Sequence, residues 1–262
     1  MGVVRRRPRT LFLAGDSSVA SRQRSLQPMT GWGQALPLFL RGIDTVNCAR
    51  AGASARSFVE RGRLGWILRE ARPSDLVLVS FGLIDMKHAV GRFAEPFTDY
   101  QRYLRRCVGG ARDRGAHPVL VTSHERRAFD AQGNLRRLLG LYPLAMKEVA
   151  EADSVPLIDL NEWSVGRWRG AGPRATRRIF LHLEPGEHRN FPDGVADNTH
   201  LRAAGAIECA RFVAGELRDR AILEPDRFAR LDSPDVPEDS VEWLEDHVFD
   251  ELTRTRTLEV VT

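Results

Sequence analysis

Short apolar runs alternate with longer amphipathic stretches along most of the chain. The runs are rich in leucine and β-branched residues and are bounded by glycine or polar positions, as expected of buried strands. They cover residues 10–14, 44–48, 75–82, 117–122 and 155–160. Segments with helical spacing lie between and after them, at residues 31–41, 57–70, 95–114, 136–152 and 202–220.

This alternation predicts the fold class, because strands separated by helices form parallel sheets that helices cover on both faces. We expect an α/β protein: a three-layer α/β/α sandwich around a mostly parallel, five-stranded sheet. In this interpretation residues 1–221 form one domain, and residues 222–262 form an acidic tail that contains a helix. The tripeptide Pro237-Glu238-Asp239 is suited to start that helix, with a proline and acids in its first turn.

The apolar face of the expected last helix has two interpretations. Val241, Leu244, Val248 and Leu252 would share one side of it. The simpler interpretation is that the helix docks on its own domain. The alternative is that this face provides a contact for a partner or for a second copy of the chain.

The first apolar run ends in the sequence GDSS, residues 15–18. These residue types favour turns, so a plain turn is one interpretation. Sites in parallel sheets, however, lie outside the carboxyl ends of the strands, which is where Ser17 falls. A serine nucleophile needs a base, and the base needs an acid that orients it. The sequence DNTH, residues 197–200, places a carboxylate and an imidazole three positions apart, where a turn would let them hydrogen-bond.

Several segments, taken in order, resemble the sequence blocks of the SGNH or GDSL hydrolase superfamily, and within it most closely those of rhamnogalacturonan acetylesterase-type enzymes. They are GDSSVA at residues 15–20, TGWGQ at 30–34, NCARAGASARSF at 47–58, FGLID at 81–85 and DNTH at 197–200. The likeness runs through most of residues 10–220. No single block is decisive, but their order and spacing together are specific.

The resemblance implies a role for each site residue. Ser17 would attack an acyl carbonyl, His200 would take its proton and pass it to the leaving alcohol, and Asp197 would hold the imidazole. The backbone N–H groups of Ser17 and Gly52 would face the oxyanion. Asp16 would fix the loop through hydrogen bonds to backbone N–H groups.

The third block departs from the family pattern, which reads Gly-x-Asn-Asp. Here Ile84 stands where the asparagine side chain would donate a further hydrogen bond to the oxyanion, and Asp85 follows it. Losing one such donor typically costs roughly 100–1,000-fold in turnover. We expect Ile84 and Asp85 to line the site together with Asp16. Arg56 would either line the site and bind substrate or brace its own loop.

Three hypotheses on function follow. The first is a serine esterase or deacetylase that acts on a small O-acylated metabolite or glycoside. The second is a non-hydrolytic biosynthetic enzyme on the same fold, in which the triad transfers protons during an elimination or an intramolecular cyclisation, with sulfate or an acyl group as the leaving group. The third is an inactive binding protein, which an intact Ser-His-Asp set argues against.

Charge and composition restrict the partners. The net charge is +4, but the basic residues are dispersed arginines apart from the run at residues 5–7, and no nucleic-acid-binding motif accompanies them. We therefore expect no nucleic-acid partner. No stretch approaches the roughly 18–20 apolar residues of a membrane span, and the first apolar run is too short for a signal peptide. We expect a cytoplasmic protein with no membrane association.

The remaining chemistry-bearing residues indicate no metal and no cofactor. The three cysteines, Cys48, Cys107 and Cys209, are far apart and in no metal-binding spacing, as expected of reduced thiols. No glycine-rich phosphate loop or dinucleotide fingerprint occurs. The expected partner is therefore a small-molecule substrate.

Overall fold

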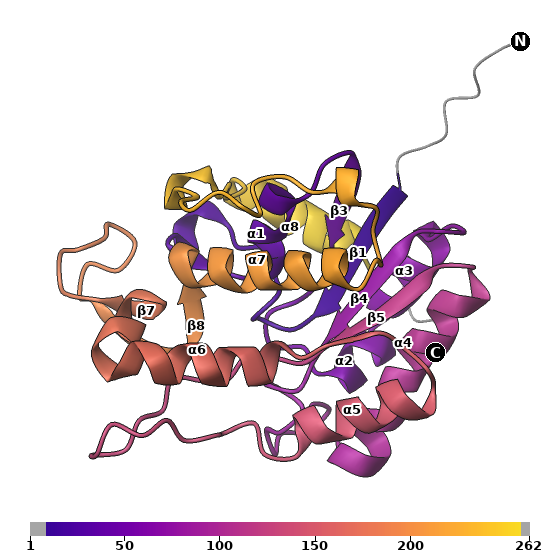
Figure 1. Cartoon of the computed structure of the whole chain (residues 1–262), viewed down its shortest axis with the longest axis horizontal. Helices are drawn as coiled ribbons and strands as arrows, with labels where there is room; N and C mark the ends of the chain where they lie inside the picture. Colours follow the sequence, from indigo (N-terminus) through magenta and orange to yellow (C-terminus); the bar gives the residue numbers. More distant parts are fainter. Residues whose placement is uncertain (1–8, 258–262) are drawn as a thin grey trace, which may run out of the picture.

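Figure 1 shows a computed structural model of the chain, which describes residues 9–257. The basic run at residues 5–7 lies outside the described residues. A central sheet of five parallel strands has the order β3-β1-β4-β5-β6. The strands are β1 (Arg9–Gly15), β3 (Ile43–Asn47), β4 (Leu76–Ser80), β5 (His117–Val121) and β6 (Leu157–Ile158). Each strand overlaps one predicted apolar run, and the expected fold class is confirmed.

Helices cover both faces of this sheet (Figure 1). On one face lie α1 (Trp32–Ala35), α6 (Leu160–Ala175, kinked at Gly172) and α7 (Ala203–Asp219). On the other face lie α2 (Ala55–Glu60), α3 (Arg63–Glu70), α4 (Gln101–Asp113) and α5 (Tyr142–Ala152). Side chains of β1 alternate between the two layers: Leu11 and Leu13 pack into the first core, and Phe12 and Ala14 into the second.

Shorter helical turns connect these elements. They are η1 (Arg24–Leu26), η2 (Leu36–Phe39), η3 (Pro96–Tyr100), η4 (Thr176–Arg178), η5 (Pro225–Arg227) and η6 (Glu238–Ser240). Within residues 9–257, no helix combines the length and the apolar character needed to cross a membrane.

The sheet register brings four loops to one edge of the molecule. Gly15 at the end of β1 pairs with Ser80 at the end of β4, and Leu13 pairs with Asn47 at the end of β3. Because the strands are parallel, the loops that follow β1, β3, β4 and β5 all leave the sheet at its carboxyl edge. This edge is where a parallel α/β sheet places its site.

A second, antiparallel sheet supplies the remaining wall of that edge. It contains β2 (Met29–Thr30), β8 (Val195–Arg202) and β7 (Phe180–Leu183), in that order. The segment at residues 197–200, which was expected to form a turn, therefore lies inside a strand. The pairing of β7 with β8 is irregular between Phe180 and His182, and this irregularity frees the backbone of residues 197–200 for local hydrogen bonds.

The last helix begins later than the sequence indicates. Residues 238–240 form only the short turn η6, and α8 spans Asp246–Thr255. Leu244, which was placed on the expected helix, instead forms an isolated bridge with Gln23, and its carbonyl accepts a hydrogen bond of 2.8 Å from the Arg24 N–H. These tertiary contacts require extended backbone and override the local helix signal.

Candidate active site

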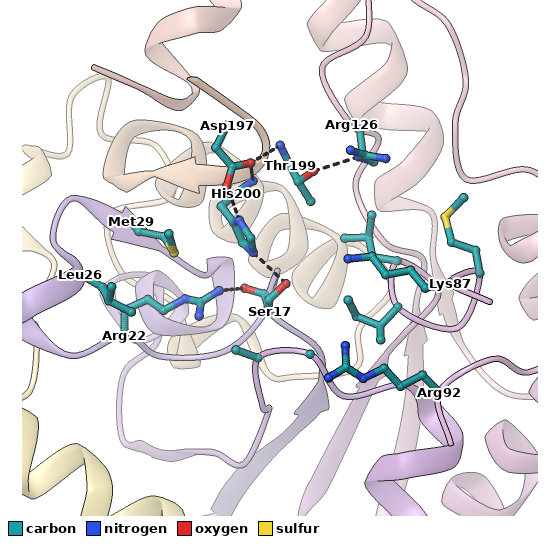
Figure 2. A pocket seen from close by; sticks show the side chains of 15 residues that line it. Ser17, Arg22, Leu26, Met29, Lys87, Arg92, Arg126, Asp197, Thr199 and His200 are labelled. Carbon is teal, nitrogen blue, oxygen red and sulfur yellow. Dashed lines mark hydrogen bonds and ion pairs between the residues drawn. The ribbon is translucent and has the colours of Figure 1, made fainter. Parts of the chain in front are cut away.

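Ser17, His200 and Asp197 form one chain of hydrogen bonds at the carboxyl edge of the sheet (Figure 2). Ser17 follows β1, whereas the other two residues come from β8. The Ser17 Oγ atom lies 3.1 Å from His200 Nε2. His200 Nδ1 lies 2.6 Å from Asp197 Oδ2. The structure thus brings the three predicted catalytic residues together in the order that nucleophile, base and orienting acid require.

The Asp197 carboxylate is held by its own neighbours as well as by the imidazole. Its Oδ1 atom accepts hydrogen bonds from the backbone N–H groups of Thr199, at 2.7 Å, and His200, at 3.0 Å. Burial by itself raises the pKa of Asp197, but the hydrogen bonds from His200 and Thr199 and the charge of His200 bring the pKa well below its usual value. The carboxylate therefore stays ionised and can stabilise an imidazolium.

The loop that carries Ser17 is held by an aspartate and an arginine. Asp16 Oδ1 accepts a hydrogen bond of 2.8 Å from the Ser18 N–H, and Arg22 Nη2 donates one of 2.7 Å to the Ser17 carbonyl. Burial raises the pKa of Asp16. Burial also lowers the pKa of Arg22 to about 10, although the nearby Asp16 charge opposes that change. Asp16 thus fixes its loop through a backbone N–H, as the resemblance implies.

Two backbone N–H groups beside Ser17 are available to a ligand. Among the described residues, neither the Ser17 N–H nor the Gly52 N–H donates a hydrogen bond to a protein acceptor. Gly52 follows β3 and has a φ of +76°, which favours glycine. Both predicted oxyanion donors therefore belong to loops at the same edge as the Ser17 hydroxyl.

Asp85 stabilises two segments that border the site. It is fully buried, and its two oxygens accept hydrogen bonds from the N–H groups of Ala55, at 2.8 Å, and Gly82, at 3.0 Å. Burial raises the pKa of Asp85 to about 8 against the effect of these bonds. Its carboxyl group ties the loop after β4 to the start of α2. Neither Asp85 nor Asp16 lines the cavity directly, whereas Ile84 does.

The expectation that Arg56 lines the site is corrected by the structure. Arg56 lies on α2, and its Nε atom is 3.1 Å from both carboxylate oxygens of Glu60. Glu60 is one helical turn further along the same helix, so the two side chains pair on its surface. Arg56 is absent from the residues that line the cavity.

A cavity of about 500 Å³ opens in front of Ser17. Four cations line it, namely Arg22, Lys87, Arg92 and Arg126. Arg126 is held in place, because its Nε atom donates a hydrogen bond of 2.9 Å to the Thr199 hydroxyl. Sequence reasoning did not assign Arg22, Arg92 or Arg126 to the site, since no local motif marks them. What they share is a position in a loop that follows a strand of the central sheet.

A serine, a histidine and an aspartate in series at the edge of a parallel sheet are the groups that a serine hydrolase requires. The chain belongs to the GDSL-like lipase/acylhydrolase family, whose family profile matches residues 13–206. It is 42% identical over 210 residues to the rhamnogalacturonan acetylesterase RhgT of Bacillus subtilis (strain 168), covering 80% of this chain and 89% of that protein. It is 35% identical over 211 residues to the probable rhamnogalacturonan acetylesterase YesY of the same organism, covering 80% of this chain and 92% of that protein. The chain is thus a carboxylic ester hydrolase of this family.

Solved structures have the same fold. The protein YxiM from Bacillus subtilis superposes with a TM-score of 0.70 at 26% identity, over 82% of this chain. This chain spans 57% of the length of that protein. A variant of an acetyl-xylooligosaccharide esterase from Geobacillus superposes with a TM-score of 0.57 at 18% identity, over 80% of this chain and 94% of that one. The second similarity concerns the fold alone.

Proposed function

We propose that this protein is a serine esterase that removes an acyl group, first of all acetyl, from a hydroxyl of a small metabolite or glycoside. The observation that carries the proposal is the hydrogen-bonded series from Ser17 Oγ through His200 to Asp197. It opens into a cavity beside two N–H groups for which residues 9–257 provide no acceptor. A nucleophile, its base and donors for the oxyanion are the parts that acyl transfer needs.

In the first half of the reaction, Ser17 Oγ forms a bond to the acyl carbon while His200 Nε2 takes the hydroxyl proton. The carbonyl π electrons move to the oxygen, which becomes negatively charged and faces the N–H groups of Ser17 and Gly52. The oxyanion then collapses, the bond to the alcohol breaks, and His200 gives its proton to the leaving oxygen. An acyl ester of Ser17 and a free alcohol result.

In the second half, a water molecule gives a proton to His200 and its oxygen attacks the acyl carbon. The second oxyanion collapses, Ser17 leaves as an alkoxide that recovers the proton from His200, and the acid is released. Asp197 remains ionised throughout and stabilises each imidazolium. The net reaction is one ester and one water to one alcohol and one carboxylic acid.

The substrate class is supported by the relatives and by the cavity lining. Two relatives are named rhamnogalacturonan acetylesterases, and a protein of the same fold is named an acetyl-xylooligosaccharide esterase. Leu83, Ile84 and Met86 give the cavity an apolar side that suits an acetyl methyl group. Its cations and open side suit a polar, hydroxylated alcohol, so O-acetylated glycosides are the first substrates to test.

The test is acetate release from 4-nitrophenyl acetate and from acetylated xylo- and rhamnogalacturonan oligosaccharides. Wild type, Ser17→Ala and Arg56→Ala are run in parallel, because Arg56→Ala removes an arginine near the site but outside its lining. We expect turnover by wild type and Arg56→Ala and background rates for Ser17→Ala. Background rates for folded wild type on every ester would contradict the proposal and direct attention to elimination or cyclisation chemistry.

A further inference from the structure

In the proposed reaction the oxyanion faces two backbone N–H donors and the hydrocarbon side chain of Ile84. The N–H groups of Ser17 and Gly52 are available, as described above. The loop after β4 contributes the Ile84 side chain to the cavity, and this side chain is only 5% exposed. A hydrocarbon cannot donate a hydrogen bond, so this side leaves the developing charge without a partner unless another residue reaches it.

The Arg92 side chain lies close to Gly52. Its Nη2 atom lies 3.9 Å, and its Cζ atom 4.0 Å, from the point where a β carbon on Gly52 would stand. Apart from the neighbours of Gly52 in the chain, no other atom of residues 9–257 comes within 4 Å of that point. Arg92 lines the same cavity as Ser17, and Figure 2 shows its guanidinium end directed towards Ser17. The guanidinium group therefore lies close to Gly52, whose N–H is one of the two backbone donors.

The Arg92 guanidinium is unpaired in the described part of the protein. No hydrogen bond or ion pair joins its guanidinium to any residue between 9 and 257. In contrast, Arg22 donates to the Ser17 carbonyl and Arg126 to the Thr199 hydroxyl. The five N–H donors of Arg92 are thus available to a ligand in the cavity.

The backbone that carries Arg92 is anchored at its base. The Ala94 N–H donates a hydrogen bond of 3.1 Å to the Asp85 carbonyl, which closes the loop. The Tyr142 hydroxyl lies 3.1 Å from that carbonyl and 2.9 Å from the Ala94 carbonyl. Arg92 is two residues from this anchor, and its own N–H donates to the Ala89 carbonyl at 3.0 Å. The Arg92 side chain therefore extends from a backbone that hydrogen bonds hold in place.

We propose that Arg92 donates the third hydrogen bond to the oxyanion and replaces the donor that Ile84 cannot supply. This inference rests on the proposed function of Ser17 as the nucleophile. A guanidinium is a charged donor, and charge-assisted hydrogen bonds are roughly twice as strong as neutral ones. The interaction strengthens as negative charge develops on the carbonyl oxygen, so its loss acts mainly on kcat.

The test uses 4-nitrophenyl acetate, a neutral ester that needs no cation for its recognition. Five proteins are compared: wild type, Arg92→Ala, Arg92→Lys, the double variant Ile84→Asn with Arg92→Ala, and Arg56→Ala as the matched control. We expect Arg92→Ala to lower kcat by roughly 100–1,000-fold with KM changed by less than about threefold. Arg92→Lys retains part of the rate, and the double variant regains at least about tenfold over Arg92→Ala, since an amide at position 84 restores a donor.

The outcomes separate the inference from the proposed function. If Ser17→Ala abolishes turnover but Arg92→Ala stays within about threefold of wild type, Arg92 is not an oxyanion donor and the esterase assignment stands. An effect of Arg92→Ala on KM alone would also overturn the inference. If wild type and Ser17→Ala hydrolyse the ester equally, both proposals are wrong. Arg92 is exposed, so we expect its variants to fold as wild type does. Equal thermal midpoints of the variants verify that a loss of activity does not come from unfolding.

Discussion

His200 Nε2 lies 3.1 Å from Ser17 Oγ, although 183 positions separate the two residues in the chain. The pairing of β2 with β8 fixes this distance. Thr30 pairs with Leu201, the residue after His200, and Met29 pairs with Arg202. The segment that leaves the Ser17 loop is therefore tied to the strand that carries the base. A short two-residue strand thus contributes to the geometry of the catalytic pair.

Replacement of Asp197 by asparagine tests the role of the orienting acid. An amide keeps the shape of the side chain but loses the charge that stabilises an imidazolium, and it offers a donor where His200 Nδ1 needs an acceptor. We expect kcat to fall by roughly 10³–10⁴-fold with little change in KM. Asp193→Asn in the preceding loop is the matched control. A loss below about tenfold would show that His200 is oriented by another group.

Arg22 is predicted to hold the Ser17 loop rather than to bind substrate. Its guanidinium is buried and donates to the Ser17 carbonyl, and its charge faces Asp16 and Asp197. We expect Arg22→Met to destabilise the fold by about 3 kcal/mol, because the buried Asp16 and the half-buried Asp197 lose a nearby positive charge. Displacement of Ser17 should also lower kcat by up to roughly 100-fold. Urea denaturation and steady-state kinetics measure the two effects. An unchanged unfolding free energy would contradict the bracing role.

His124 makes the stability of the fold sensitive to acid. It is buried after β5, its Nδ1 lies 3.0 Å from the Glu125 carbonyl, and burial lowers its pKa from 6.5 to about 4. Between pH 6.5 and 4 the His124 imidazole is protonated in the unfolded chain but neutral in the folded chain. The unfolding free energy therefore falls as pH decreases from 6.5 towards 4. The full contribution is roughly 3 kcal/mol.

The measurement is the unfolding free energy of wild type and of His124→Gln across this pH range. Glutamine cannot titrate, so the acid-induced loss of stability should be smaller in the variant. His117→Gln, at the exposed start of β5, controls for replacing a histidine. Parallel pH curves for wild type and His124→Gln would contradict the prediction.

The C-terminal segment is predicted to support one wall of the cavity. The Trp243 indole N–H donates a hydrogen bond of 3.1 Å to the carbonyl of Met29, and Met29 lines the cavity. The Arg24 and Glu245 side chains form an ion pair of 2.9 Å beside it. We expect Trp243→Ala to raise KM for an acetylated oligosaccharide by about tenfold and to affect 4-nitrophenyl acetate less. Trp243→Phe keeps the ring and should have the smaller effect. Equal changes for both esters would argue against this support.

The central sheet was predictable because its strands are buried on both faces and therefore appear as nearly continuous apolar runs. The segment LVLVS of β4 is an example, with all five residues buried. Helix α6 was not predicted. Its three glycines and one proline, at positions 166–173, suggest a loop, yet Leu160, Val165 and Trp168 pack into the core and decide its conformation. Tertiary packing overrides weak helix propensity at such positions.

The site was predictable only where a local motif marks it. Ser17, Asp197 and His200 stand in recognisable blocks, and the structure brings them together. Arg92 and Arg22 stand in ordinary sequence, and only the closure of their loops over the sheet edge directs them to the cavity. Arg56 shows the opposite error: its place near Gly52 suggested the site, but the phase of α2 directs it to Glu60. Sequence proximity does not determine on which side of a helix a side chain lies.

Covalent labelling shows whether Ser17 is the nucleophile. Wild type, Ser17→Ala and Arg56→Ala are incubated with a fluorophosphonate, and intact mass and peptide mapping locate the adduct. We expect one adduct per chain on Ser17 in wild type and Arg56→Ala, and none in Ser17→Ala. An adduct on another residue, or no adduct on folded wild type under conditions that label a known serine esterase, would contradict the claim that Ser17 is the nucleophile.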